Sequence, residues 1–267
     1  MNRIDATFAR LHASGRKALV GYLTAGDPSP QAGAAVLAAA CRAGLDVLEL
    51  GVPFSDPTSD GPAIQAASQR ALRAGMTLRA ALAMAAALRR DVETPLVFFS
   101  YLNPLLRYGL ARFCEEAAGA GADGLLVVDL PPEEAGELRA AAAARNLHLI
   151  RLVAPTTRPE RMRAIAEGAG GFLYLISRTG VTGEGGVDPS AVARHAAELR
   201  QACALPVCVG FGVRGGADAA ALAPLADGVV VGSALVRLVA EHANDPRLPE
   251  TVAAKVRELR QALDARR

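Results

Sequence analysis

Short apolar segments alternate with amphipathic or alanine-rich segments eight times along this chain. Their nearly continuous hydrophobicity is typical of parallel strands that are covered on both faces. Eight strand–helix units in 267 residues fit one closed barrel better than an open sheet. We therefore expect an α/β fold, a single-domain (β/α)8 TIM barrel over residues 1–267, with an extra N-terminal helix near 2–14 and further extra helices. The predicted strands lie at about 18–23, 45–49, 95–99, 124–128, 147–152, 171–176, 206–210 and 227–231.

The rival fold for such an alternation is an open, doubly wound sheet. It predicts a Gly-x-Gly-x-x-Gly turn after the first strand, whereas Gly26 stands alone there. In a closed barrel, the segments that follow the strands meet at one end, and barrel enzymes place their active sites at that end. The residues directly after each predicted strand are therefore the candidates for function.

Composition argues against several classes of function. The net charge of +2, without a basic cluster, argues against a nucleic-acid-binding protein. Cys41, Cys114, Cys203 and Cys208 show neither metal-ligand nor disulfide spacing, so we expect reduced thiols in a cytoplasmic protein. The first residues do not resemble a signal peptide, and no apolar run has the length that a membrane span needs.

The stretch from residue 48 to residue 62 carries two carboxylates in unlike surroundings. Glu49 is flanked by leucines at the predicted end of the second strand, and Asp60 follows on a loop punctuated by glycine and proline. Two carboxylates in different environments can divide the roles of acid and base between them. The structural alternative places Glu49 in a buried ion pair and makes Ser59 or Asp60 the cap of a helix that begins near Pro62. Because both acids stand on one such stretch, catalysis is favoured.

Glycine-rich segments follow the last three predicted strands. The stretch 177–186 is either a polar surface loop or a lid whose Thr182 can reach Asp60. The turns at 210–212 and 232–233 stand where barrels often bind phosphate on backbone N–H groups, although glycines also simply make tight turns. Four aromatic residues can line an apolar pocket at this end of the barrel or belong to the core: Tyr22, Phe99, Tyr174 and Phe211.

Two absences narrow the chemistry. The lysines Lys17 and Lys255 lie before the first strand and in the terminal helix, so neither is placed to form a Schiff base. The four histidines stand far apart without metal-ligand spacing, and no cysteine adjoins a histidine in a nucleophile motif. We therefore expect no metal, no cofactor, and acid–base chemistry by carboxylates on a phosphorylated substrate.

Five motifs closely resemble those of the tryptophan synthase alpha chain family, and the resemblance extends from about Phe8 to the terminal helix. They are Leu-Glu-Leu-Gly-Val-Pro-Phe-Ser-Asp-Pro at 48–57, Tyr-Leu-Asn-Pro at 101–104, Asp-Leu-Pro-Pro-Glu-Glu at 129–134, Ser-Arg-Thr-Gly-Val-Thr-Gly at 177–183 and Gly-Phe-Gly-Val at 210–213. The first and the fourth motifs are highly specific.

The resemblance implies cleavage of indole-3-glycerol phosphate to indole and glyceraldehyde 3-phosphate, a retro-aldol reaction without a cofactor. It implies that Glu49 moves protons at the substrate hydroxyl and at indole C3, and that Asp60 stabilises charge on the indole nitrogen. It further implies that Thr182 is a lid residue that closes on Asp60. The implied phosphate site comprises Gly183, Gly212, Gly232 and Ser233, and the implied pocket residues are Tyr22, Tyr174 and Phe211.

Exposed apolar loop residues are expected after the third strand, where they suggest a docking surface unless they fold back under the loop. The resemblance implies that the partner is the tryptophan synthase beta chain, in an alpha2–beta2 heterotetramer. The beta chain is a pyridoxal-phosphate enzyme, so pyridoxal phosphate is expected only in the partner. The expected docking surface comprises Asp56, Pro57, Asn103, Pro104, Leu105, Leu106, Tyr108, Pro131 and Pro132.

Two other functions remain alternatives. A phosphosugar isomerase on the same barrel would use Glu49 as a base and would need a fixed cation or a neutral histidine to polarise the carbonyl. A non-catalytic subunit that only activates its partner would have no need of Glu49 or Asp60, and both are present.

Overall fold

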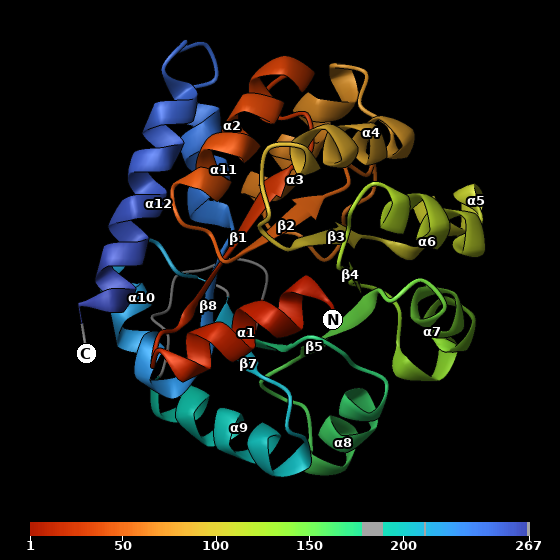
Figure 1. Ribbon diagram of the computed structural model, residues 1–267, viewed down its shortest axis with the longest axis vertical. Helices are drawn as coiled ribbons and strands as arrows, with labels where there is room; N and C mark the ends of the chain where they lie inside the picture. Colours follow the sequence, from red (N-terminus) through yellow and green to blue (C-terminus); the bar gives the residue numbers. More distant parts are fainter. Residues whose placement is uncertain (178–188, 211, 266–267) are drawn as a thin grey trace.

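The computed structural model describes residues 1–177, 189–210 and 212–265. Eight parallel strands close into a barrel, in which each strand pairs with its neighbours in sequence and β8 returns to β1 (Figure 1). The predicted (β/α)8 barrel is therefore confirmed. The strands are β1 (Ala18–Thr24), β2 (Val47–Gly51), β3 (Leu96–Ser100), β4 (Gly124–Val127), β5 (His148–Val153), β6 (Leu173–Ile176), β7 (Val207–Gly210) and β8 (Gly228–Val231).

Helices surround the barrel, and most of them begin where local sequence places a cap or a proline. The Ser29 and Thr77 hydroxyls cap α2 and α4 by accepting hydrogen bonds from backbone N–H groups three residues on. The helices are α1 (Arg3–Ala13), α2 (Pro30–Arg42), α3 (Pro62–Arg73), α4 (Leu78–Arg89), α5 (Leu102–Tyr108), α6 (Leu110–Gly119), α7 (Gly136–Ala143), α8 (Pro159–Glu167), α9 (Pro189–Ala202), α10 (Gly216–Leu222), α11 (Ser233–Glu241) and α12 (Leu248–Asp264), with short 3-10 turns η1 (Pro132–Glu134) and η2 (Ala223–Leu225).

Helix α1 closes the amino-terminal end of the barrel, and Figure 1 shows it lying across the strands inside the ring of helices. Its apolar side chains, such as Ile4 and Phe8, pack into the cluster that fills the barrel interior, and Phe8 lies 5.7 Å from Phe172 between ring centroids. The Asn2 side chain caps α1 and also donates to the carbonyl oxygens of Asp123 and Asn146, both at 2.8 Å. Helix α1 therefore plugs the amino-terminal end of the barrel interior.

The alternation of side chains along β2 decides where Glu49 points. Val47 belongs to the interior cluster, whereas Leu48 and Leu50 belong to the outer cluster between the strands and the helices. Successive side chains of a strand point to opposite faces, so Glu49 points into the barrel. The prediction that β2 ends at Glu49 is wrong, because the ladder with β1 continues to Gly51.

A short helix, α5, replaces the loop that was expected after β3. Pro104 lies in its first turn, where the missing N–H group costs no helical hydrogen bond, and Gly109 with φ of +95° ends it. Among the described residues no single helix has the length and apolar character to cross a membrane; only α3 and α4 pass that test together, as a pair bent by 95°.

Candidate active site

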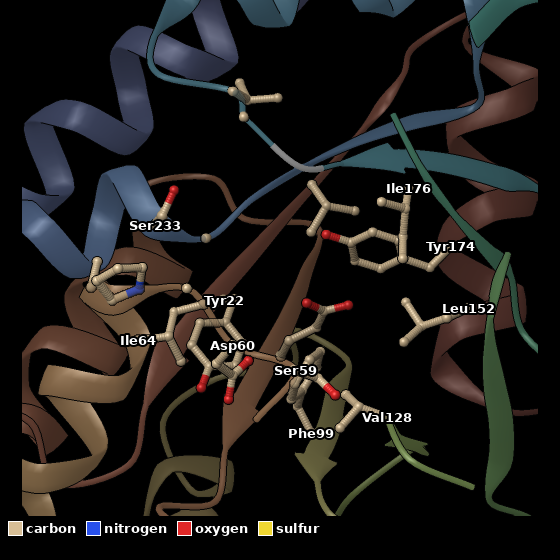
Figure 2. Close-up of a pocket in the computed structure, with 18 of the residues that line it drawn as sticks. Tyr22, Ser59, Asp60, Ile64, Phe99, Val128, Leu152, Tyr174, Ile176 and Ser233 are labelled. Atoms are coloured by element: carbon tan, nitrogen blue, oxygen red, sulfur yellow. The ribbon is translucent and has the colours of Figure 1, made fainter. Parts of the chain in front are cut away.

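A cavity of about 770 Å³ opens at the carboxyl end of the barrel. Figure 2 shows Tyr174, Ile176 and Leu152 on one side of it and Tyr22 and Asp60 on the other. The structure therefore brings together most of the predicted site residues from strands and loops that are far apart in sequence. The predicted residues that line the cavity are Tyr22, Glu49, Asp60, Phe99, Tyr174, Gly212, Gly232 and Ser233.

Glu49 lies deep in this cavity with only 1% of its surface exposed. Its Oε1 atom has no hydrogen-bond partner among the described residues, so the ion pair of the structural alternative is not found there. Burial disfavours the charged form and raises the pKa of the Glu49 carboxyl from 4.5 to about 8. At neutral pH this side chain is therefore mainly an acid that holds a proton.

Asp60 also faces the cavity but has a different environment. Its Oδ2 atom accepts a hydrogen bond of 3.1 Å from the Tyr101 hydroxyl. Burial raises the pKa of the Asp60 carboxyl to about 6, and the hydrogen bond from Tyr101 opposes that rise. The helix cap of the structural alternative is not found, because the N-cap of α3 is Gly61 and no side chain caps it. The two carboxylates thus have separated pKa values.

Two glycines make room for the aromatic walls of the cavity. A Cβ atom at Gly51 would overlap the Tyr22 hydroxyl, and a Cβ atom at Gly210 would overlap the Tyr174 hydroxyl. The Tyr22 ring also packs edge-on against Phe99, with 5.0 Å between ring centroids. The walls are therefore apolar and aromatic near the buried carboxylates, which suits a flat, mostly apolar ligand group.

The N-terminus of α11 forms another part of the cavity wall. Gly232 is the N-cap of this helix without any side-chain cap, so the first N–H groups of α11 are left for a ligand. Gly212, with φ of +91°, lines the cavity on the turn after β7. These residues suit an anion such as phosphate.

Sequence reasoning missed Arg237 as a cation for this anion site. Arg237 lines the cavity, and its Nη2 atom lies 3.5 Å from Ser233 Oγ. Arg237 stands four residues after Ser233, and residues with that spacing share one face of a helix. This spacing was the sequence signal that could have placed Arg237 beside Ser233. Arg214 lines the cavity as well.

Three predicted site residues, Thr182, Gly183 and Phe211, lie outside the described residues, as does most of the expected lid. Among the residues that are described, no group of three or more His, Cys, Asp or Glu side chains is arranged to hold a metal ion.

The expected docking surface requires one correction. Leu105 is fully buried, with 0% exposure, so the prediction that it is exposed is wrong. The reason is the helix α5, which turns Leu105 toward the core and its neighbour Leu106 outward, where it is 51% exposed. Leu106 and Met1 are the large hydrophobic side chains that stand exposed within the described part of the chain.

The other expected docking residues are exposed or partly exposed. Asp56 and Asn103 are exposed. The Tyr108 ring packs under the Arg112 guanidinium, 4.8 Å from the ring centroid, and the Tyr108 hydroxyl donates a hydrogen bond to Glu116. Five of the expected docking residues are partly buried: Pro57, Pro104, Tyr108, Pro131 and Pro132.

The fold and the site together define a class of protein. A closed (β/α)8 barrel with two buried carboxylates and a helix N-terminus around one cavity is a barrel enzyme suited to acid–base chemistry on an anionic substrate.

Comparison with known proteins narrows this class to one family. The sequence profile of the tryptophan synthase alpha chain matches residues 8–265. The tryptophan synthase alpha chain of Desulfosudis oleivorans is 52% identical over 262 residues, which cover 98% of this chain and 99% of that relative. The structure of tryptophan synthase subunit alpha from Legionella pneumophila is similar with a TM-score of 0.92 and 38% identity, covering 99% of both chains. A tryptophan synthase structure from Mycobacterium tuberculosis gives a TM-score of 0.90 at 39% identity over 98% of both chains. The chain belongs to the tryptophan synthase alpha chain family.

Proposed function

We propose that the cavity at the carboxyl end of the barrel is the active site of a carbon–carbon lyase of tryptophan biosynthesis. The reaction is the cleavage of indole-3-glycerol phosphate to indole and glyceraldehyde 3-phosphate, and membership of the tryptophan synthase alpha chain family supports it. The observation that carries the assignment of the site is that two buried carboxylates, Glu49 and Asp60, share one cavity with the N-terminus of α11.

Glu49 is assigned both proton transfers. With a pKa of about 8 its carboxyl is mostly protonated at neutral pH, so it can donate a proton to C3 of the indole ring. That step leaves a positive charge on the ring nitrogen. When the bond from C3 to the glycerol chain breaks, its electrons return to the ring, and the Glu49 carboxylate accepts the proton of the hydroxyl that becomes the aldehyde. The proton count then balances over the cycle.

Asp60 is assigned the role of stabilising the positive charge that develops on the ring nitrogen. Its pKa of about 6 leaves the carboxyl mostly ionised at neutral pH, in contrast to Glu49. A carboxylate fixed beside a developing positive charge stabilises the transition state more than the ground state. The aromatic wall formed by Tyr22 and Phe99 lies near it and suits the apolar faces of an indole.

The phosphate is assigned to the N-terminus of α11. Its N–H groups, the turn at Gly212 and the Arg237 guanidinium offer complementary charge and hydrogen-bond donors. By the family resemblance, Gly183 contributes to this site and Thr182 closes on Asp60. Phe211 is assigned to the pocket on the same basis.

We also propose that this chain needs no cofactor and acts in the cytoplasm with the tryptophan synthase beta chain, as an alpha2–beta2 heterotetramer. Membership of the tryptophan synthase alpha chain family supports a beta-chain partner. Leu106 at the carboxyl end of the barrel is the exposed apolar side chain that suits docking. Pyridoxal phosphate would then belong to the partner.

The isomerase alternative has less support. It needs a fixed cation or neutral histidine beside a carbonyl, and no histidine lines the described part of the cavity wall. His148 lies on β5, within the predicted strand 147–152, and its Nε2 atom lies 2.8 Å from Asp5 Oδ1 of α1, at the plugged end. A non-catalytic role would not require both Glu49 and Asp60 to face the cavity.

The test is release of indole from indole-3-glycerol phosphate by the wild-type chain and by Glu49→Gln. General acid–base catalysis contributes roughly 10²–10⁴-fold, so the variant should lose almost all turnover while still binding a substrate analogue. The matched control is Glu241→Gln, which changes an exposed acid at the end of α11. If Glu49→Gln keeps more than about a tenth of the turnover, less than ~1.4 kcal/mol of the barrier depends on Glu49 and its role is refuted.

A further inference from the structure

Tyr101 connects the end of β3 to the catalytic cavity without lining it. It follows Ser100, the last residue of β3, and serves as the N-cap residue of α5. Only 4% of its surface is exposed, and its ring packs against Phe54 with 5.1 Å between ring centroids. Tyr101 is not among the residues that line the cavity, so it acts on a ligand there only through a neighbour.

The Tyr101 hydroxyl makes two hydrogen bonds to adjacent residues of the loop before α3. It donates to Asp60 Oδ2 at 3.1 Å and accepts from the backbone N–H of Ser59 at 3.0 Å. The Asp60 backbone is held separately, because its N–H donates to Pro57 O at 3.1 Å and its carbonyl accepts from Gln65 Nε2 at 2.8 Å. The carboxylate orientation therefore depends on Tyr101, whereas the path of the loop has additional support.

We propose that Tyr101 is a positioning residue for Asp60: it holds Oδ2, so that Oδ1 is presented to the ring nitrogen of the substrate. This inference rests on the proposed function of the cavity. Of the two oxygens of a carboxylate, only one can then rotate toward a ligand without breaking the bond to Tyr101. The orientation exists before the substrate binds, which removes the cost of ordering Asp60 during the reaction.

The charge state of Asp60 depends on groups from several elements. Tyr22 of β1, Glu49 of β2 and Tyr101 after β3 face it or share its cavity, and Arg214 and Arg237 line the same cavity. Of these, Tyr101 donates the hydrogen bond that opposes the effect of burial and lowers the pKa of Asp60. A hydrogen bond to the ionised form of a carboxyl favours that form, so its removal should raise the pKa.

The experiment is Tyr101→Phe, which removes the hydroxyl and keeps the ring contact with Phe54. We expect kcat for indole release to fall about tenfold or more, since hydrogen bonds to charged groups are among the stronger ones. We also expect the acid limb of kcat/KM to move to higher pH by about one unit. Binding of a substrate analogue at high pH, where Asp60 remains ionised, should change little.

A second readout does not depend on activity. The pKa of the Asp60 carboxyl, followed by ¹³C NMR in both proteins, should be higher in Tyr101→Phe than in the wild type. The control is Phe98→Leu, which perturbs the same strand on its outer face, where Phe98 packs against Phe113 at 5.7 Å. It should lower stability and leave the pKa of Asp60 unchanged.

The two proposals fail in distinguishable ways. A wild-type chain that releases no indole would refute the proposed function. An Asp60 pKa that is the same in Tyr101→Phe and wild type, with unchanged kcat, would overturn the positioning role of Tyr101. An equal pKa shift in Phe98→Leu would also overturn it, since that shift would arise from a general loosening of β3.

Discussion

Replacement of Glu49 by glutamine should stabilise the folded chain at neutral pH while it abolishes turnover. Glutamine has the size and shape of a protonated glutamate but cannot ionise. Folding raises the pKa of Glu49 from 4.5 to about 8 because the carboxyl is withdrawn from water without a partner for Oε1 among the described residues. Between these two pH values the folded chain binds more protons than the unfolded chain, so its stability falls as the pH rises.

The size of this effect follows from the two pKa values. At pH 7 the unfolded carboxyl is ionised, and keeping it protonated in the barrel costs about 3.5 kcal/mol, from about 1.4 kcal/mol per pKa unit over about 2.5 units. At pH 5 the same cost is below about 1 kcal/mol, because the unfolded carboxyl is then only partly ionised. The stability advantage of Glu49→Gln should therefore grow by about 2.5 kcal/mol between pH 5 and pH 7.

Urea unfolding of both proteins at pH 5, 6, 7 and 8, followed by circular dichroism, measures this difference. Glu241→Gln serves as the control for removal of an acid from the surface, and its stability difference should show no comparable growth. A difference between Glu49→Gln and wild type that stays constant from pH 5 to pH 8 would refute the reasoning. It would mean that folding does not perturb this carboxyl, and that Glu49 is not the protonated acid at neutral pH.

Four further outcomes are expected. The kcat/KM for indole release should follow a bell-shaped pH profile with limbs near pH 6 and pH 8, because ionised Asp60 and protonated Glu49 are both required; a flat profile there would contradict the pairing. Ser233→Asp should weaken binding of an indole-alkyl phosphate far more than binding of indole in calorimetric titrations, since a carboxylate repels phosphate, and equal losses would argue against the phosphate site. Leu106→Asp should abolish co-elution with the beta chain in gel filtration while the isolated chain keeps its indole release; undiminished co-elution would remove Leu106 from the interface. Leu105→Asp should instead lower the unfolding temperature steeply, because it buries an unpaired charge.

The sequence alone determined the architecture and the chemical inventory. Eight apolar segments separated by helical ones admit few arrangements other than a barrel, because parallel strands need a covering helix after each strand. The acids Glu49 and Asp60 were also evident, since they flank glycine and proline residues that end regular structure. In each case the signal is local, and local backbone preferences depend on neighbouring residues.

Tertiary structure decided the hydrogen-bond partners, the burial and the pKa values of those residues. Tyr101 and Asp60 are 41 positions apart, and no local pattern indicates that the hydroxyl of one would hold the carboxyl of the other. Leu105 and Leu106 are adjacent and chemically identical, yet the rotation of α5 buries one and exposes the other. The raised pKa of Glu49 has the same origin, because desolvation depends on which atoms the closed barrel places around the carboxyl and not on the residues beside it in the chain.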